Sequence, residues 1–399
     1  MWIDEAVLYQ IYPLGFCGAP EENDGVPAHR LQKVTEWIPH LKWLGVDGVY
    51  FSPLFESDRH GYDTRDFFRV DTRLGTNGDL REVCRALHEN GIRVIFDGVF
   101  NHVGRGFAQF RDVLEHREQS PYRDWFFVNF SGNNAYQDGL WYEGWEGHYE
   151  LVKLNLRNPA VREYLFSAIR FWVEEFGIDG LRLDVAYLLD RDFLCALRTF
   201  CDGLKPDFPL IGEVLFGDYN LLVNDRMLHS CTNYENYKSL YSAINSENLW
   251  ELSYSLNRQF GPEQWCIYRG KHLLTFLDNH DVTRIASILR DADCLPLAWV
   301  LLMTQPGIPT IYYGSEWGVT GRKEEGDATL RPCSESPVRN ALTEHIAALI
   351  RMRKSDRIWT CGGYRNLEQG TRKLTFAREL DGRQVCVTVD LAAHDWKIE

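Results

Sequence analysis

The sequence predicts a short buried strand at Asp179-Gly180-Leu181-Arg182-Leu183-Asp184-Val185-Ala186. Because alternate residues of a strand point to the same side, Arg182 and Asp184 share one face. Leu181 and Leu183 point to the other face. A carboxylate held beside a guanidinium stays ionised, as a carboxylate nucleophile must be. An ion pair that only closes the turn after the strand explains this stretch equally well, because ion pairs also serve structure.

Strand-like and helix-like segments alternate along the chain on both sides of this strand. Each strand candidate is a short apolar run, and each helix candidate has apolar residues along one face. Asn158-Pro159 is expected to begin the helix that precedes the central strand. Eight strands alternating with helices predict an α/β fold, the parallel (β/α)8 or TIM barrel, whose chemistry lies where the strands end. The strand candidates are residues 6–12, 46–51, 92–97, 180–184, 208–213, 231–234, 273–278 and 308–314.

Two further parts are expected outside the barrel. Residues 103–157 are rich in aromatic residues, Gly and Asn and have no clean period, so we expect a small inserted domain after the third strand. Residues 372–377 and 384–389 alternate like antiparallel strands joined at Asp381-Gly382. The predicted domains are a catalytic barrel of residues 1–102 and 158–354, an inserted domain at 103–157 and a short C-terminal antiparallel β domain at 355–399.

The composition argues against several classes of protein and partner. Of the 399 residues, 45% are hydrophobic and 14% aromatic, so the chain can form a large core. A net charge of −14 argues against nucleic acid and membrane partners, because both favour positive surfaces. The most apolar helix candidate, residues 295–304, is too short to span a bilayer, and the acidic start predicts no secretory signal. The ten Cys form no C-x-x-C pair, so we expect reduced thiols in a cytoplasmic protein.

Acidic residues stand at four of the predicted strand ends. Asp97, Asp184 and Glu213 end the third, fourth and fifth strands, and Asp281 follows the seventh. The C-terminal ends of barrel strands meet on one face, so we expect these carboxylates to form an active site. Crowding raises the pKa of at least one of them, which gives a proton donor beside an ionised nucleophile. Two carboxylates in these roles are what retaining hydrolysis of glycosides requires.

Four short motifs, in this order and at barrel spacing, resemble the signatures of the α-amylase superfamily of glycoside hydrolases. They are Asp97-Gly98-Val99-Phe100-Asn101-His102, Gly180-Leu181-Arg182-Leu183-Asp184, Gly212-Glu213-Val214 and Phe276-Leu277-Asp278-Asn279-His280-Asp281. The resemblance covers nearly the whole barrel.

The resemblance also implies a role for each matching residue. Asp184 would be the nucleophile, Glu213 the acid/base and Asp281 the stabiliser of the transition state. The segment His60-Gly61-Tyr62-Asp63 is similar to the one whose Tyr stacks on the sugar at the cleavage subsite. The residues implied to bind that sugar are Tyr62, His102, Arg182 and His280. Asp97 is expected to orient the site rather than to react.

A fifth segment, Leu151-Val152-Lys153-Leu154-Asn155, resembles a further family signature and bears on metal binding. Calcium-dependent amylases have an Asp ligand where this chain has Lys153, beside the Asn that matches Asn101. An ammonium group cannot ligate calcium but can supply positive charge in its place, so we expect no calcium site there. The sequence assigns no other metal ligands and no cofactor, and it leaves open whether an ion binds elsewhere. Lys153 with Leu154-Asn155, and Asp184-Val185-Ala186, resemble the cyclomaltodextrinase, neopullulanase and maltogenic amylase group. Those enzymes act on cyclodextrins, maltodextrins and sometimes pullulan.

Three departures separate the chain from that group. The group's usual N-terminal β domain, which builds the dimer, is expected to be missing because the first predicted strand begins almost at Met1. Tyr187 and Leu188 stand where polar residues commonly face the acceptor site. The C-terminal β module is shorter than usual. We therefore expect a monomer or a weak homodimer with an α-glucan oligosaccharide or polysaccharide as its substrate.

The sequence leaves three functions to compare. The first is a retaining, endo-acting hydrolase of α-1,4-glucosidic bonds in maltodextrins, starch or cyclodextrins, acting through a covalent glycosyl-aspartate. The second is an exo-acting α-glucosidase or a 4-α-glucanotransferase with the same carboxylates, because residues 129–149 could either close the cleft or line a longer one. The third is a non-catalytic carbohydrate-binding barrel, which is disfavoured because Asp184, Glu213 and Asp281 are all present.

Overall fold

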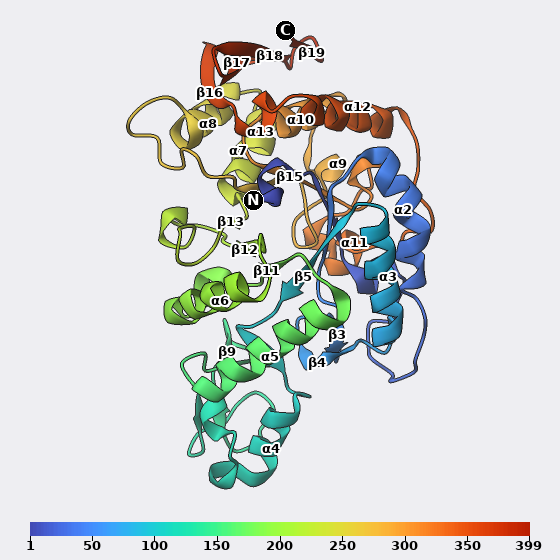
Figure 1. Cartoon of the computed structure of the whole chain (residues 1–399), viewed down its shortest axis with the longest axis vertical. Helices are drawn as coiled ribbons and strands as arrows, with labels where there is room; N and C mark the ends of the chain where they lie inside the picture. Colours follow the sequence, from blue (N-terminus) through green and yellow to red (C-terminus); the bar gives the residue numbers. More distant parts are fainter.

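A closed sheet of eight parallel strands forms the centre of the computed structural model, which describes residues 1–399 (Figure 1). In chain order the strands are β1 (Leu8–Ile11), β2 (Gly48–Phe51), β5 (Arg93–Gly98), β11 (Gly180–Leu183), β12 (Leu210–Gly212), β13 (Ser230–Cys231), β14 (Leu274–Phe276) and β15 (Ile308–Tyr312). They pair in the order β13-β12-β11-β5-β2-β1-β15-β14. A parallel bridge between Thr232 and Leu274 joins the two ends of this order, so the predicted (β/α)8 barrel is confirmed.

Helices surround this barrel. The eight longest of the barrel are α2 (Gln32–Leu44), α3 (Asn77–Glu89), α5 (Pro159–Phe176), α6 (Arg191–Leu204), α7 (Tyr234–Asn245), α8 (Leu249–Phe260), α10 (Leu295–Thr304) and α12 (Ala341–Ser355). α5 begins as expected, because the side chain of Asn158 accepts from the N–H of Ala160 and Pro159 occupies the first helical position. In α10 every residue from 297 to 304 is buried, because this helix lies between the barrel and the C-terminal sheet (Figure 1).

The segment between β5 and α5 leaves the barrel and forms a small region at one end of the molecule (Figure 1). It contains α4 (Ala108–His116), the strand pair β7 (Val128–Asn129) and β8 (Trp141–Tyr142), and a three-stranded antiparallel sheet. That sheet has the order β6 (His102–Gly104), β10 (His148–Lys153) and β9 (Gly144–Trp145). Because β6 begins only four residues after β5 ends, the small sheet lies next to the C-terminal end of β5 in the barrel.

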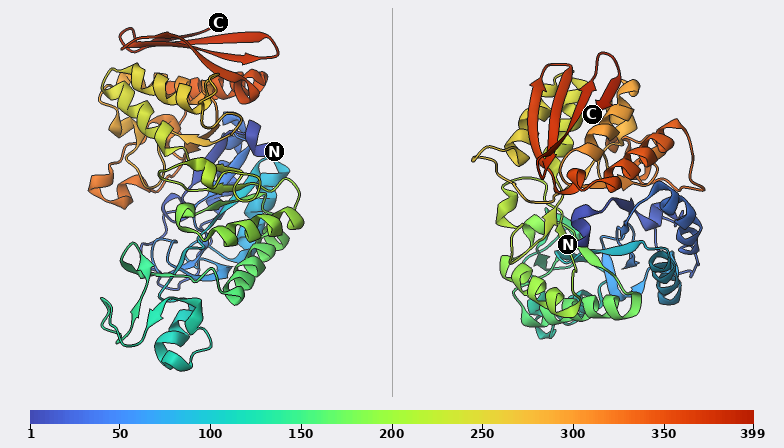
Figure 2. Two further views of the ribbon diagram at one scale, coloured as in Figure 1. Left: turned by 90° about the vertical axis from the view of Figure 1, so that its left-hand side faces the viewer. Right: turned by 45° about the horizontal axis from the view of Figure 1, so that its top comes forward.

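A four-stranded antiparallel sheet closes the other end of the molecule (Figure 2). Its strands, in sheet order, are β16 (Gly363–Gln369), β17 (Lys373–Leu380), β18 (Arg383–Asp390) and β19 (Asp395–Ile398). The two strands predicted from the sequence are β17 and β18, and the Asp381-Gly382 turn that joins them has φ values of 51° and 76°. Two positive φ values are typical of the tight turns that match the twist of a hairpin.

One continuous apolar core joins these parts. The main cluster of buried apolar residues extends from the barrel helices to Phe110 in the protruding region and to Phe376 in the C-terminal sheet. A second, smaller cluster fills the inside of the barrel with residues of its strands, including Leu8, Tyr50 and Ile95. No helix has both the length and the apolar character that crossing a bilayer requires.

Candidate active site

Three carboxylates meet around one guanidinium at the C-terminal ends of β5, β11 and β12. Nη1 of Arg182 donates to Oδ2 of Asp97 at 2.8 Å and to Oδ1 of Asp184 at 2.8 Å. Nη2 of Arg182 lies 2.9 Å from Oε1 of Glu213. All four side chains are buried, so each charge relies on these partners rather than on water. The structure therefore brings together three of the acidic strand ends expected from the sequence.

Asp281 joins this group from the loop after β14. Its Oδ2 lies 2.9 Å from Nε2 of His280, and its Oδ1 accepts from Nη2 of Arg331 at 2.8 Å. The same nitrogen of Arg331 lies 3.1 Å from Oδ2 of Asp327. Asp327 and Arg331 were not among the residues expected from the sequence, because they lie at the two ends of the short helix α11 (Asp327–Leu330), outside the predicted strands and helices. Their spacing of four residues, which places a carboxylate and a guanidinium together, was the available signal.

His280 is held from several directions. The side-chain amide of Gln10, on β1, donates to its Nδ1 at 2.8 Å. Its Nε2 faces both Asp281 and the hydroxyl of Tyr62. The rings of Tyr62 and His280 are nearly parallel, with an angle of 9° and centroids 5.6 Å apart. Gln10 was also missed, although a single amide in an otherwise apolar strand is a visible signal.

His102 lies beside Asp184 with one ring nitrogen unused. Nε2 of His102 is 4.0 Å from Oδ2 of Asp184 and has no hydrogen-bond partner. The amide nitrogen of Asn101 lies 3.1 Å from Nδ1, which makes Nδ1 the acceptor and leaves the proton on Nε2. Burial lowers the pKa of His102 to about 3, so the ring is neutral. A buried N–H without a partner is available to a ligand in the cavity.

The surroundings raise the pKa of two carboxyl groups of the site, Asp184 and Glu213, and lower that of a third, Asp281. Burial raises the pKa of Asp184 to about 7, against the charge of Arg182. Burial also raises the pKa of Glu213, and the negative charges of Asp184 and Asp281 add to this. For Asp281 burial acts in the same sense, but His280 and Arg331 outweigh it and hold the pKa of Asp281 below its usual range. The site can therefore hold a protonated carboxyl beside ionised ones.

The residue after Asp184 has a strained backbone. Val185 has φ 48° and ψ 40°, a left-handed conformation that is rare for a β-branched residue. Its N–H donates to Oε2 of Glu213 at 3.1 Å. Strained conformations of this kind persist where the surroundings impose them, often at functional sites. Here the strained turn fixes the positions of Asp184 and Glu213 relative to each other.

These groups open into a cavity of about 530 Å³, within the usual range of small-molecule sites. Arg182 and His280, two of the residues expected to bind sugar, lie behind the surface of this cavity and support the residues that form it. The expected site residues that line it are Tyr62, His102, Asp184, Glu213 and Asp281.

The protruding region supplies another wall of this cavity. Trp145 and His148, on β9 and β10, belong to its lining. The hydroxyl of Tyr187, in the loop after β11, lies 3.3 Å from Oε1 of Glu146. The ring of Tyr187 also packs against Phe216, with centroids 5.4 Å apart. Tyr187 therefore connects the β9–β10 hairpin to the barrel loops at the rim of the cavity.

The segment expected to bear on calcium binding lies next to this site. Lys153 is the last residue of β10 and pairs with His102 of β6 across the small sheet. Its ammonium forms an ion pair with Glu143. The side chain beside His102 at the end of β10 is therefore an ammonium group. Its positive charge does not suit a calcium ion, since calcium binds oxygen ligands.

Comparison with known proteins identifies the family of this fold and site. Residues 10–357 match the family model described as "Alpha amylase, catalytic domain". A cyclomaltodextrinase from a Bacillus species is 31% identical over 420 aligned residues, which span 98% of this chain and 74% of that protein. Neopullulanase 2 of Thermoactinomyces vulgaris is 32% identical, over 98% of this chain and 70% of that protein.

A solved structure agrees in fold over nearly the whole chain. It is the ligand-free form of a cyclic alpha-maltosyl-(1→6)-maltose hydrolase from Arthrobacter globiformis. The two structures superimpose with a TM-score of 0.86 at 27% sequence identity, over 98% of this chain and 91% of that one. The agreement includes the barrel that carries the carboxylates.

Proposed function

The chain belongs to the alpha-amylase family of glycoside hydrolases, and from this premise we propose that it is a retaining, endo-acting hydrolase of α-1,4-glucosidic bonds. Hydrolysis of α-1,4 glucans is the activity that its relatives support. One guanidinium, that of Arg182, contacts both Asp184 and Glu213. That contact supports a nucleophile and a proton donor held side by side, as retaining chemistry requires.

In the proposed reaction Glu213 gives its proton to the glycosidic oxygen while Asp184 attacks the anomeric carbon. The C–O bond to the leaving sugar breaks, and a covalent bond from Asp184 to the sugar forms. Glu213, now ionised, takes a proton from water as the water attacks this intermediate, and Asp184 is released. The raised pKa of Glu213 supports its role as the proton donor.

The remaining residues of the site bind and stabilise the sugar in this proposal. Asp281, kept ionised by His280 and Arg331, places negative charge near the developing oxocarbenium ion. The unused Nε2–H of His102 is a donor for a sugar hydroxyl. Tyr62 offers an aromatic ring on the cavity wall.

Short or cyclic maltodextrins are the substrates that we favour over starch. One relative is named cyclomaltodextrinase, and the solved structure belongs to a hydrolase of a cyclic maltosyl-maltose. The hydrogen bond from Tyr187 to Glu146 joins two segments at the rim of the cavity, which supports a preference for compact substrates. We further propose that turnover requires no calcium, because Lys153 occupies the place of a ligand.

Two properties of the whole molecule are also proposed. All ten cysteines are free thiols, which supports a cytoplasmic location, where thiols stay reduced. We propose a monomer or a weak homodimer with a saccharide as its partner, because the net charge of −14 disfavours nucleic acid.

A product time course on maltoheptaose, β-cyclodextrin, pullulan and soluble starch tests this proposal. We expect β-cyclodextrin to be cleaved faster than starch and maltose to appear first, as the α-anomer. Free glucose as the first product would favour the exo-acting α-glucosidase. Longer saccharides formed from maltoheptaose would favour the 4-α-glucanotransferase, and no turnover of any substrate would favour a binding protein.

A further inference from the structure

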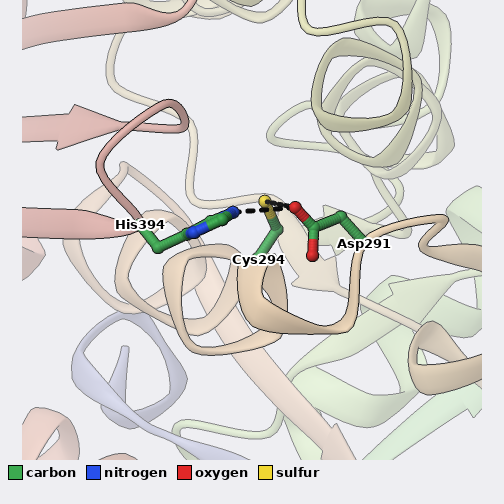
Figure 3. Close-up of side chains that lie close together, drawn as sticks. All are labelled: Asp291, Cys294 and His394. Atoms are coloured by element: carbon green, nitrogen blue, oxygen red, sulfur yellow. Dashed lines mark hydrogen bonds and ion pairs between the residues drawn. The ribbon is translucent and has the colours of Figure 1, made fainter.

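Three side chains of types that bind metals meet at the junction between the barrel and the C-terminal sheet (Figure 3). Asp291 and Cys294 lie at the short 3-10 helix that precedes α10, and His394 lies in the loop between β18 and β19. Figure 3 shows the imidazole and the thiol both directed toward the carboxylate of Asp291. One oxygen, one sulfur and one nitrogen atom of these side chains lie within 4.8 Å of one another.

The distances between these atoms suit a tetrahedral ion. Sγ of Cys294 lies 3.8 Å from Oδ2 of Asp291, and Nε2 of His394 lies 2.7 Å from the same oxygen. Ligands bound to zinc at about 2.0–2.3 Å in tetrahedral geometry are about 3.3–3.7 Å apart. The sulfur–oxygen distance of 3.8 Å is slightly longer than this range. The nitrogen must move by roughly half an ångström, which a partly exposed imidazole can do by rotation.

The local backbone presents these groups to one another. Asp291 caps the short helix by accepting the N–H of Asp293 through Oδ1 at 3.0 Å, which leaves Oδ2 free to face the cluster. On the other side, the N–H groups of Ala392 and Ala393 donate to Asp390, which folds the β18–β19 loop. His394 follows in a left-handed conformation with φ 50°. The short 3-10 helix and the β18–β19 loop thus bring three possible metal ligands to one point.

We propose that Asp291, Cys294 and His394 bind one zinc-class divalent cation, with water as the fourth ligand. A thiolate with an imidazole and a carboxylate is a ligand set that zinc accepts, whereas calcium and magnesium require oxygen ligands. On binding, the thiol of Cys294 gives its proton to solvent and forms a bond to the metal. Nε2 of His394 gives up the proton that it donates to Asp291, either to solvent or, in the neutral ring, in exchange for one on Nδ1, and then bonds to the same ion. The open side of the cluster admits the water.

The proposed ion has a structural role. The short helix with Asp291 and Cys294 leads directly into α10, and α10 packs against β18 and β19. An ion at this point would fasten the last two strands of the C-terminal sheet to the barrel. None of its ligands lines the cavity of the active site, so the ion should affect stability and not the chemical step.

Cobalt binding to the full-length, reduced, chelator-treated protein is the direct test. The parent protein carries Cys333→Ser and Cys361→Ser, which remove the two exposed thiols. We expect one equivalent of Co²⁺ to give the visible bands of a tetrahedral site and a thiolate-to-cobalt charge-transfer band. One equivalent of Zn²⁺ should abolish both.

Variants of the ligands and of matched residues separate a site from adventitious binding. Cys294→Ser should lose the charge-transfer band, and His394→Asn should weaken cobalt binding at least about tenfold. Cys386→Ser and Asp293→Asn, which change the same residue types outside the ligand set, should bind like the parent. Zn²⁺ should raise the Tm of the parent and leave that of His394→Asn unchanged.

Two results would overturn the proposal. One is the absence of a charge-transfer band from the parent at one equivalent, which would leave an ordinary His394–Asp291 ion pair. The other is a band, or a rise in Tm with zinc, that is equal in the parent and in His394→Asn. Because His394 lies in an exposed loop, this variant keeps the test valid even where Cys294→Ser, at a buried position, fails to fold.

Discussion

The backbone N–H of Val185 donates to Oε2 of Glu213 at 3.1 Å, so the turn after the proposed nucleophile holds the proposed acid/base directly. Arg182 holds the other oxygen of Glu213 and also one oxygen of Asp184. The two reacting groups are thus both positioned by β11 and the turn that follows it. This arrangement lets the site keep its geometry while one carboxyl gains or loses a proton.

Glu213→Gln should fold normally and lower kcat on maltoheptaose by about 10²–10⁴-fold, because the amide cannot donate the proton that the leaving group needs. KM should change little, since Glu213 acts on the leaving oxygen rather than on the sugar hydroxyls. Product assays with a thermal melt of the same sample measure both effects. The control is Glu235→Gln, whose carboxylate pairs with Arg258 outside the cavity. Wild-type turnover by Glu213→Gln would remove the residue from the acid role.

Asp97→Asn should move the acidic limb of the pH profile of kcat/KM to lower pH. Turnover requires ionised Asp184, so activity falls as the pH drops through the pKa of that group, which burial raises to about 7. The charge of Asp97 also raises this pKa, so its removal lowers it. Asp190→Asn, at a helix start outside the cavity, should leave the limb in place. A limb unmoved by Asp97→Asn would contradict the proposed electrostatic coupling.

Tyr187→Phe should raise kcat/KM on starch relative to maltoheptaose by roughly fivefold, because it removes the hydroxyl that joins the rim to Glu146. One hydrogen bond contributes about 1 kcal/mol, which corresponds to that ratio. The ring and its packing against Phe216 remain, so the change tests the bridge alone. Tyr254→Phe, an exposed tyrosine on α8, is the matched control. An unchanged ratio would mean that the bridge does not select substrates.

Calcium should not change the rate. In chelator-treated protein, kcat/KM on maltoheptaose should be equal with and without added calcium, because Lys153 puts an ammonium group where a ligand would be. The same comparison in the His394→Asn variant separates calcium from the proposed zinc-class ion. Activity that is lost on chelation and restored only by calcium would show that our interpretation of Lys153 is wrong.

Asp179→Asn should lower the free energy of unfolding by about 1.5–3 kcal/mol at pH 7. Asp179 is buried and accepts from Nε2 of His88, Nζ of Lys205 and the N–H of Val94, at 2.8, 2.9 and 2.9 Å. Burial opposes ionisation, but these donors outweigh it and lower the pKa of Asp179.

The pH dependence of this difference follows from the direction of that shift. The stabilisation by ionised Asp179 is fully present above the pKa of an unfolded Asp, about 3.9, and is lost as the pH falls through the lower folded value. The gap in urea midpoint between wild type and Asp179→Asn should therefore shrink below pH 4. Asp202→Asn, an exposed residue paired with Arg198, should have no measurable effect.

The sequence predicted the barrel well because its strands are short apolar runs that end in carboxylates. Each of the eight predicted segments overlaps a strand of the closed sheet, although the sixth, residues 231–234, shares only Cys231 with β13. β16 and β19 were missed because they lie at the edges of the C-terminal sheet and expose many of their residues, so they lack a clean apolar alternation.

The site was predicted less completely than the fold. Asp97, Asp184 and Glu213 could be placed together because parallel strands end on one face. Gln10 and Arg331 each had a local signal, but that signal does not show their contacts with His280 and Asp281, which join segments that are far apart in the chain. Such contacts depend on how loops fold over the barrel, and no local pattern records that.

The barrel closes through a short seam, since β13 has two residues and a single bridge from Thr232 to Leu274 completes the ring. Glu213 follows β12, which pairs with β13 on one side, and Asp281 lies in the loop after β14 on the other. Small opening motions of a sheet concentrate where the fewest hydrogen bonds hold it. The ring of strands thus has its fewest backbone contacts between the strands that lead to the proposed acid/base and to the proposed stabiliser, whereas Asp184 and Arg182 are held by the better paired β11.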